Sequence, residues 1–260
     1  MIPFVYRPKS RKNTKPMPLP AGVTIRPASS SDLSLTGHWQ CRFLRDGLFP
    51  RLGPRFVRHW HATFLDAPCG FAFIAEAQSP DGHVPLGFLF GSSDQLRHVD
   101  DVLRVHRTRL AVQGGLALVI RPRLFLGFLR TRARSYLRRL LKRPVTGAAP
   151  TAGPVPVAVA VPRVAVITAL VVHPESRGHG VGEQLVNHFL SRASDAGAPL
   201  AELVTKAGPG GAGRFYERLG WAPVHAHTTK DGETAKTYRV DLSQRNPEGD
   251  RPPAQELPQE

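Results

Sequence analysis

A glycine-rich loop beside an arginine is the stretch of this sequence best suited to hold a charged ligand. Arg177 is followed by three glycines at alternate positions, Gly178, Gly180 and Gly182. Glycine lets the backbone approach a ligand closely and adopt conformations that other residues avoid. Arginine adds a permanent positive charge. The loop therefore predicts a binding site for an anion.

The segments on either side of this loop strengthen that prediction. An unbroken run of apolar and β-branched residues from Val164 to Val172 predicts a strand buried on both faces, and Pro174 ends it. Behind the loop, Val181, Leu185 and Phe189 recur at helical spacing. The first N–H groups of a helix lack partners within it, and the helix dipole adds positive charge there. A strand, a glycine turn and a helix N-terminus together form a cradle for phosphate.

Two common phosphate-binding motifs do not fit this loop. A nucleoside-triphosphate loop would continue with Gly-Lys-Ser or Gly-Lys-Thr, and that sequence is absent. A dinucleotide fingerprint would need a glycine at position 183, where Glu183 stands. The ligand is therefore expected to be a phosphate compound of another class.

The pattern that fits is Arg-x-x-Gly-x-Gly, read at Arg177, Gly180 and Gly182. It resembles the acyl-CoA-binding loop of the GNAT family of N-acetyltransferases. Downstream, the segment 212–221 is similar to a later helix of that family, which carries the pattern Phe-Tyr-x-x-x-Gly-aromatic. The similarity is clear over 160–242.

The resemblance implies an α/β (α+β) fold with a mixed, mostly antiparallel central sheet flanked by helices. The residues agree with it: 22–28, 200–205 and two runs within 225–238 read as strands, and 70–76 and 84–91 read as a hairpin. Between Leu33 and Leu65 we expect helices broken near Pro50 and Pro54. The chain divides into a disordered basic arm (1–21), an acetyltransferase domain (22–242) and a disordered tail (243–260). Within the domain lie a basic helical insertion (95–143) and a flexible linker (144–160).

Acetyl-CoA is the co-substrate that the resemblance implies, and no metal is expected. The main chain at 170–172 would bond the pantetheine arm, and the loop would anchor the diphosphate. Tyr216 matches a tyrosine that protonates the leaving thiolate, a task that suits a phenol of pKa about 10. The residues implied to contact acetyl-CoA are Leu170, Val171, Val172, Arg177, Gly178, His179, Gly180, Val181 and Gly182.

The expected reaction is transfer of an acetyl group to the primary amine of a small molecule, with amino sugars as one acceptor class. The alternative is a non-catalytic protein on the same fold that binds acyl-CoA or an anionic surface.

The identity of the general base stays open. The strand 164–172 lacks the glutamate that some family members place there, and His173, Asp32, Glu76 or a chain of waters could serve. Pro209 stands where the family often has asparagine, which removes one expected cofactor contact.

The insertion at 95–143 concentrates positive charge, with thirteen Lys and Arg against two Asp. Apolar residues interleave with the arginines, and helices broken at Gly114-Gly115 and near Pro122 fit this pattern. Three interpretations remain open: a helical cover over the mouth of the site, a surface for anionic lipid, or a protein-binding surface. Nucleic acid is disfavoured because no nucleic-acid-binding module accompanies the basic residues.

The composition, with a formal net charge of +15, is that of a soluble globular protein. The two cysteines, Cys41 and Cys69, show neither metal-ligand spacing nor a disulfide framework. No signal peptide and no run long enough to span a membrane are visible in the sequence. We therefore expect a cytoplasmic protein, with a homodimer as an open alternative.

Overall fold

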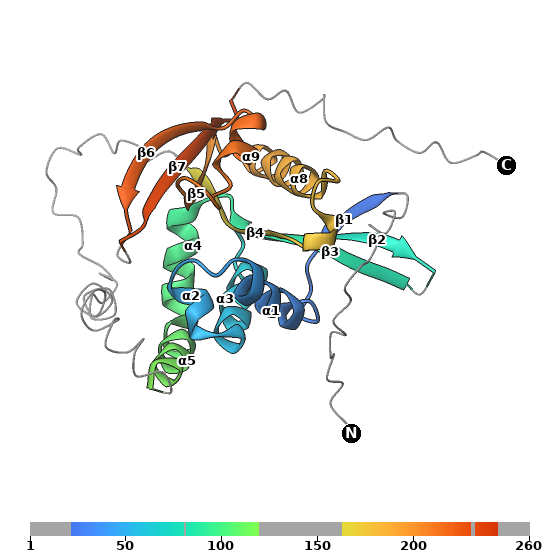
Figure 1. Ribbon diagram of the computed structural model, residues 1–260. Coiled ribbons are helices and arrows are strands. Elements are labelled where there is room, and N and C mark those ends of the chain that lie inside the picture. The colour runs from blue at the N-terminus through green and yellow to red at the C-terminus, as the bar shows by residue number, and fades with distance from the viewer. Residues whose placement is uncertain (1–21, 81, 120–162, 230–231, 244–260) are drawn as a thin grey trace, which may run out of the picture.

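A seven-stranded sheet forms the centre of the molecule (Figure 1). The computed structural model describes residues 22–80, 82–119, 163–229 and 232–243. The strand order is β1-β2-β3-β4-β5-β7-β6, and every neighbouring pair is antiparallel except β4 and β5, which are parallel. This confirms the mixed, mostly antiparallel sheet. The strands are β1 (Val23–Pro27), β2 (Gly70–Ser79), β3 (Gly82–Ser92), β4 (Val164–Val172), β5 (Leu200–Lys206), β6 (Ala222–Thr228) and β7 (Thr234–Asp241).

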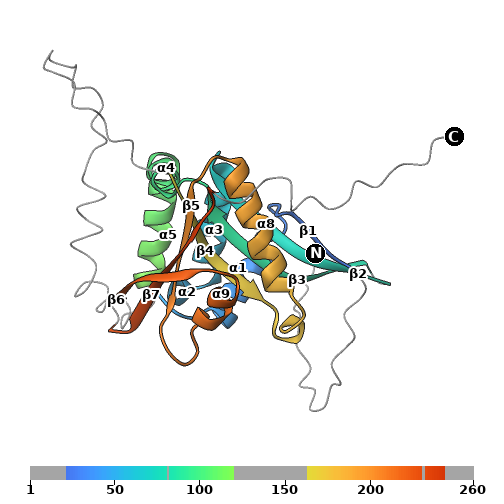
Figure 2. The same cartoon turned by 90° about the horizontal axis from the view of Figure 1, so that it is seen from above.

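Helices cover both faces of this sheet, with α8 and α9 on one side and α1, α2 and α3 on the other (Figures 1 and 2). The apolar residues of α8 pack into one core cluster with β3, β4 and β5, and α1 and α3 pack into a second. The helical elements are α1 (Leu33–Phe43), α2 (Leu48–Leu52), α3 (Pro54–Asp66), α4 (Gln95–Asp101), η1 (Val102–His106), α5 (Arg107–Val119), η2 (Pro174–Ser176), α8 (Val181–Asp195) and α9 (Gly213–Arg218).

Strand β4 contains a β-bulge that changes which face of the sheet the following side chains point to. The register with β3 passes from Ile167 opposite Gly91 to Ala169 opposite Phe90, so one extra residue, Thr168, is inserted in β4. Residues two apart on a regular strand share a face. Here Ile167 packs in the core under α8, whereas Ala169 packs in the core under α1 and α3. The residues after the bulge therefore face the opposite way from what simple alternation predicts.

The breaks between α1, α2 and α3 coincide with Gly47 and Gly53, and only one of the two prolines lies at a break. Pro54 occupies the first turn of α3, after Gly53 with φ of 95°. Pro50 does not end a helix as expected, because it lies inside the five-residue helix α2. The earlier break falls between Phe43 and Leu48, so its position was predicted wrongly by several residues.

The expected helix break at Gly114-Gly115 is wrong. Helix α5 runs through both glycines to Val119. A Cβ atom at Gly114 would lie 3.3 Å from Cε2 of Phe56, so glycine there allows α5 to pack closely on α3. The predicted break near Pro122, the arm 1–21, the linker 144–160 and the tail 244–260 lie outside the described residues. Within those described, no helix is long and apolar enough to cross a membrane.

A buried histidine gives this fold a predicted dependence on pH. His61 is fully buried, stacks on Phe90 and shares hydrogen bonds with Thr36 Oγ1 (2.9 Å, Nδ1) and Gln40 Oε1 (2.5 Å, Nε2). Burial lowers the pKa of His61 from 6.5 to about 3. Below pH 6.5 the unfolded chain therefore binds a proton at this residue that the folded protein does not.

We expect the free energy of unfolding to fall through this group by about 1.4 kcal/mol per pH unit between its unfolded pKa and its folded pKa. At pH 5 the loss should be about 2 kcal/mol relative to pH 7. The variant His61→Gln replaces the imidazole by an amide that does not titrate. Urea unfolding of this variant at pH 7 and at pH 5 should lack the loss of about 2 kcal/mol in unfolding free energy that His61 causes. The exposed His38→Gln is the control, and an unchanged slope in His61→Gln would contradict the prediction.

Candidate active site

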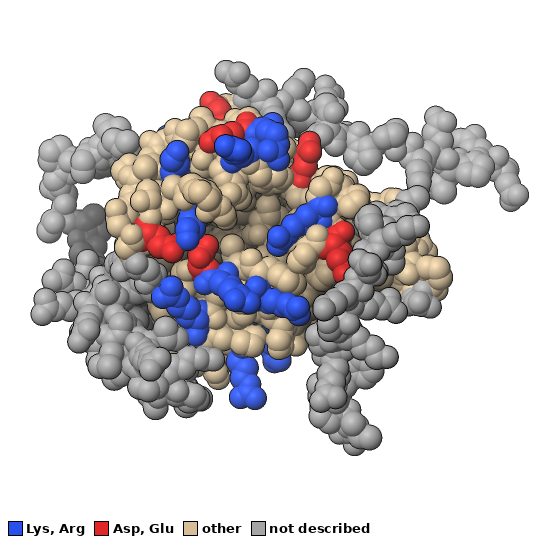
Figure 3. All heavy atoms as spheres, in the orientation of Figure 1, with Lys and Arg blue, Asp and Glu red and all other residues tan. Residues whose placement is uncertain are grey.

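A cleft of about 600 Å³ opens along the end of β4, between the glycine-rich loop 177–182, α9 and the end of α1. We call 177–182 the phosphate loop after the ligand expected from the sequence. Figure 3 shows the face that carries a central hollow, with Lys and Arg side chains around it. The cleft is lined by Phe43, Leu170, Val171, Val172, Ser176, Arg177, Gly178, Gly180, Val181, Gly182, Glu183, Ala212, Phe215, Tyr216, Arg218 and Leu219. Eight of the nine residues expected to contact acetyl-CoA are in this set, and so is Tyr216.

His179 is the expected contact residue that does not line the cleft. Its side chain turns back on the loop, with Nδ1 2.9 Å from the carbonyl oxygen of Arg177. The Arg177 side chain also bonds the local backbone, since its Nε donates to the carbonyl oxygen of Val172 at 3.2 Å. These contacts fix the shape of the loop where it leaves β4.

The loop has the backbone geometry that an anion cradle requires. Gly178 and Gly180 have φ of 82° and 77°, a region that strains other residues. Gly180 is the N-cap of α8, and its carbonyl accepts the first helical hydrogen bond from the Gln184 N–H. The preceding N–H groups of the helix have no intrahelical partner. They provide donors for a diphosphate at the positive end of the α8 dipole.

Gly182 has a different role from the other two glycines. A Cβ atom at this position would lie 3.3 Å from Phe215 and 3.4 Å from Cγ2 of Val172. The absence of a side chain therefore lets α8 approach both α9 and β4 closely. Phe215 packs against Gly182 here and also lines the cleft.

The edge of β4 that faces β5 is open beyond the bulge. The parallel pairing of β4 with β5 ends at Ile167 opposite Leu203, while β5 continues along β7 to Lys206. Within the described residues no strand pairs with this edge of β4 from Thr168 to Val172. Its N–H and C=O groups can bind an extended ligand as a neighbouring strand would. This is the geometry that the amide-containing pantetheine arm needs.

Tyr216 comes from α9 and lies against the same cleft. Its ring packs among Phe215, Trp221 and Tyr238, and the residue is buried, with 5% of its surface exposed. Burial raises the pKa of the Tyr216 hydroxyl well above its usual value near 10. The phenol therefore stays protonated at neutral pH, as a proton donor must.

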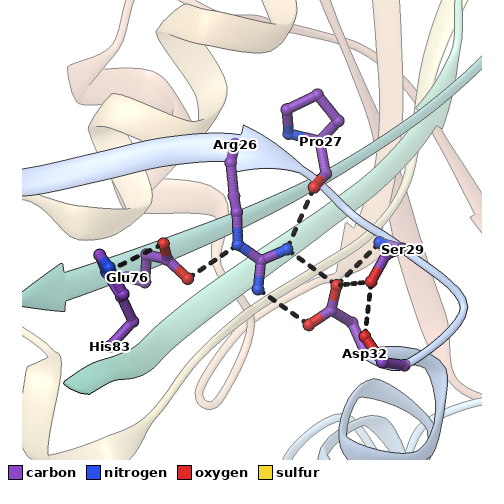
Figure 4. A network of polar contacts seen from close by, with 7 residues as sticks. Arg26, Pro27, Ser29, Asp32, Glu76 and His83 are labelled. Carbon is purple, nitrogen blue, oxygen red and sulfur yellow. Dashed lines mark hydrogen bonds and ion pairs between the residues drawn. The ribbon is translucent and has the colours of Figure 1, made fainter. Parts of the chain in front are cut away.

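Two of the three side chains considered as general base are held in a separate network (Figure 4). The Arg26 guanidinium donates to Asp32 at 2.8 and 2.9 Å and to Glu76 at 2.8 Å, while Ser29 N–H donates to Asp32 at 2.7 Å. The bond from Arg26 is the largest cause that lowers the pKa of Asp32 to about 2. A carboxylate that binds a proton so weakly is a poor base at neutral pH. Neither Asp32 nor Glu76 lines the cleft.

His173 does not line the cleft either, but it is adjacent to two residues that do, Val172 and Phe43. It follows Val172 and packs on Phe43 and Trp39, with ring centroids 5.6 and 5.1 Å away. Burial lowers the pKa of His173, Glu175 opposes that effect, and Arg42 adds to it. The imidazole is therefore neutral at pH 7 and able to accept a proton. Of the three candidate side chains, His173 fits the geometry of the cleft best.

Comparison with known proteins gives the family of this domain. Residues 149–242 match the acetyltransferase (GNAT) domain family. No curated protein matches the sequence. The three solved structures described next are between 11% and 18% identical to this chain, so their likeness shows the fold alone.

Three solved structures illustrate that fold. SsHAT is 18% identical, with a TM-score of 0.54 and coverage of 85% of this chain and 99% of the other. NAA60 from Arabidopsis thaliana, solved with acetyl-CoA, is 14% identical, with a TM-score of 0.51 and coverage of 85% and 98%. A chimera of the spermidine N-acetyltransferase SpeG from Vibrio cholerae with hSSAT is 11% identical, with a TM-score of 0.50 and coverage of 85% and 96%. The phosphate loop, the bulged strand and Tyr216 all lie within 149–242, the part of the chain that matches the acetyltransferase (GNAT) domain family.

Proposed function

We propose that this protein transfers an acetyl group from acetyl-CoA to the primary amine of a small molecule, with amino sugars among the acceptors to be tested. The observation that carries the proposal is that one cleft contains an anion-binding loop, an open strand edge and a buried phenol. The match of residues 149–242 to the acetyltransferase (GNAT) domain family and the acetyl-CoA complex of a protein with the same fold support it.

The residues of the cleft fit the parts of acetyl-CoA. The loop from Arg177 to Gly182 offers backbone N–H groups and a cation to a diphosphate. The open edge of Leu170–Val172 offers N–H and C=O groups to the amides of the pantetheine arm. Bound acetyl-CoA would supply an activated thioester carbonyl and a thiolate leaving group.

We assign the protons of this transfer to two side chains. A neutral acceptor amine attacks the carbonyl carbon, a C–N bond forms and the C–S bond breaks. Tyr216 donates its phenolic proton toward the departing sulfur, and His173 accepts the proton that the amine nitrogen loses. At neutral pH the raised pKa of Tyr216 keeps the phenol protonated, and the lowered pKa of His173 keeps the imidazole neutral.

Calorimetric titration with acetyl-CoA and release of free thiol across a panel of primary amines test the proposal together. We expect binding, and thiol release that depends on the amine. Binding without amine-dependent release would favour the alternative, a protein that holds acyl-CoA without turnover. Absence of binding would contradict both.

A second role at a membrane surface is favoured by the exposed side of the insertion. Leu96, Val105 and Val112 are 63%, 71% and 66% exposed, and the exposed Arg97 and Arg104 lie among them. Apolar side chains can enter the lipid headgroup boundary, and each nearby cation contributes about 1 kcal/mol with anionic lipid. We propose that this surface binds anionic membranes weakly.

We expect co-sedimentation with phosphatidylcholine vesicles that contain phosphatidylglycerol, and its loss at high salt. Val105→Ser combined with Val112→Ser should reduce binding, whereas Val204→Ser, at an exposed position on β5, should not. Equal binding to vesicles without the anionic lipid would contradict this role.

A further inference from the structure

The helices on the α1 side of the cleft carry an excess of positive charge. Five exposed arginines lie between Leu33 and Asp66, against two aspartates: Arg42, Arg45, Arg51, Arg55 and Arg58. In Figure 3 a row of basic side chains lies over α1, α2 and α3, directly below the hollow. Helix α8, whose N-terminus follows the phosphate loop, lies on the opposite face of the sheet from α1, α2 and α3 (Figure 1). This basic rim is therefore separate from the cradle assigned to the diphosphate.

Arg42 is a member of this rim that does not line the cleft itself but lies against a residue that does. Its guanidinium lies 5.4 Å from the centre of the Phe43 ring, and Phe43 lines the cleft. The charge of Arg42 also acts on His173, as does that of Arg177 from the loop. Among the residues that the structure describes, neither arginine forms an ion pair with a carboxylate. Two cations without such partners thus face the end of β4 from different elements.

Two acidic residues lie near this end of the cleft, and within the described residues neither forms an ion pair with Arg42: Glu175 acts on His173, and Asp46 acts on Lys206. The loop between α1 and α2 contains Asp46, which lies near Lys206 on β5. Lys206 forms an ion pair with Glu233 at 2.9 Å, and that pair, followed by Asp46, raises the pKa of the lysine. Asp46 is therefore close to Lys206, and the Arg42 guanidinium, which lies over the Phe43 ring, is left for a ligand.

Resting on the proposed transfer, we infer that the acceptor is an amine that also carries an anionic group, a carboxylate or a phosphate, and that Arg42 binds this group at the α1 rim. Arginine binds both anions through two parallel N–H donors. Trp39 and Phe43 beside His173 provide an apolar wall for the carbon skeleton. A polyamine would bring further positive charge to the same rim, so we expect spermidine to be a poor acceptor.

Matched pairs of primary amines test this inference. Glucosamine is compared with glucosamine 6-phosphate, ethanolamine with O-phosphoethanolamine, and propylamine with β-alanine, and spermidine serves as the cationic probe. The anionic member of at least one pair should have a kcat/KM higher on the order of tenfold, the size of one charge-assisted contact. The phosphate and carboxylate pairs show which anion is preferred.

Substitution of Arg42 then tests whether this residue causes the preference for anionic amines. In Arg42→Gln the preference should fall to near unity through a higher KM for the anionic amine, and Arg42→Lys should restore part of it. Acetyl-CoA affinity should stay unchanged in both. Arg192→Gln is the control, because Arg192 is an exposed arginine in the last turn of α8 that does not line the cleft.

A binding measurement keeps this inference separate from the proposed transfer. If no amine turns over, calorimetric titration of the same pairs into protein saturated with CoA should still show preference for the anionic member, lost in Arg42→Gln. Equal affinity or no binding for both members of every pair would overturn the inference. A loss of acetyl-CoA affinity in Arg42→Gln would also overturn it, because Arg42 would then belong to the co-substrate site.

Discussion

Replacement of Gly180 by valine is expected to abolish detectable binding of acetyl-CoA. Gly180 has φ of 77° at the N-terminus of α8, and a β-branched residue adopts that conformation only with strain. Its side chain would also stand where the loop must approach the diphosphate. We expect the dissociation constant from calorimetry to rise by on the order of 100-fold or more, equivalent to about 3 kcal/mol.

Gly197→Val is the matched control for this variant. Gly197 has φ of 76° just after α8, and it does not line the cleft. The two substitutions should therefore lower the melting temperature by similar amounts, whereas only Gly180→Val should lose acetyl-CoA. Unchanged affinity in a folded Gly180→Val protein would show that the loop does not bind the diphosphate.

Removal of the Tyr216 hydroxyl is expected to slow turnover without weakening acetyl-CoA binding. Tyr216→Phe keeps the ring that packs between Phe215 and Trp221, so the fold and the cleft should be preserved. It removes the proton that we assign to the leaving thiolate. General acid groups contribute about 10²–10⁴-fold to rate, so kcat should fall within that range while the KM for acetyl-CoA changes little.

Tyr238→Phe is the control, because it shows whether the loss of another buried tyrosine hydroxyl also lowers kcat. The Tyr238 hydroxyl donates to Glu217 at 2.9 Å, and the residue lies outside the cleft lining. This variant should lose some stability and retain near-normal turnover. If Tyr216→Phe stays within about twofold of the parent rate, a packing role for Tyr216 is the better interpretation, since a general acid contributes at least about 10²-fold.

Local patterns predicted the order of strands and helices in this chain well. The apolar run 164–172, the turn at Gly178–Gly182 and the spacing of Val181, Leu185 and Phe189 each reflect forces between near neighbours in sequence. These signals gave β4, the loop and α8 close to their observed bounds. The hairpin of β2 and β3 was likewise visible from its turn residues.

Features that depend on distant segments were not visible in the sequence. Phe43 lines the cleft but lies more than a hundred residues before β4, and a helical apolar pattern does not say which element it will meet. The bulge at Thr168 is set by the pairing of β4 with β3, so the change of face after it could not be read from alternation. Gly114 looked like a helix break because its packing against Phe56 is a tertiary contact.

The choice among general-base candidates also required the folded structure. In sequence, Asp32 and Glu76 are ordinary acidic residues, and only the fold brings both to Arg26. His173, in contrast, is adjacent to the loop in sequence and lies beside the cleft in the structure. Its surroundings, which include Arg42 and Trp39, come from a helix at the other end of the chain.

Transfer of an isotopically labelled acetyl group is the direct test for acetyltransferase activity at this cleft. The protein is incubated with acetyl-CoA that carries ¹³C in its acetyl group and with the amine panel, and the products are analysed by mass spectrometry. We predict labelled N-acetyl product for at least one amine, in an amount equal to the free CoA released, and its strong reduction in Tyr216→Phe and Gly180→Val. Binding of acetyl-CoA with no labelled amine, or labelled product that forms equally well in both variants, would contradict the account.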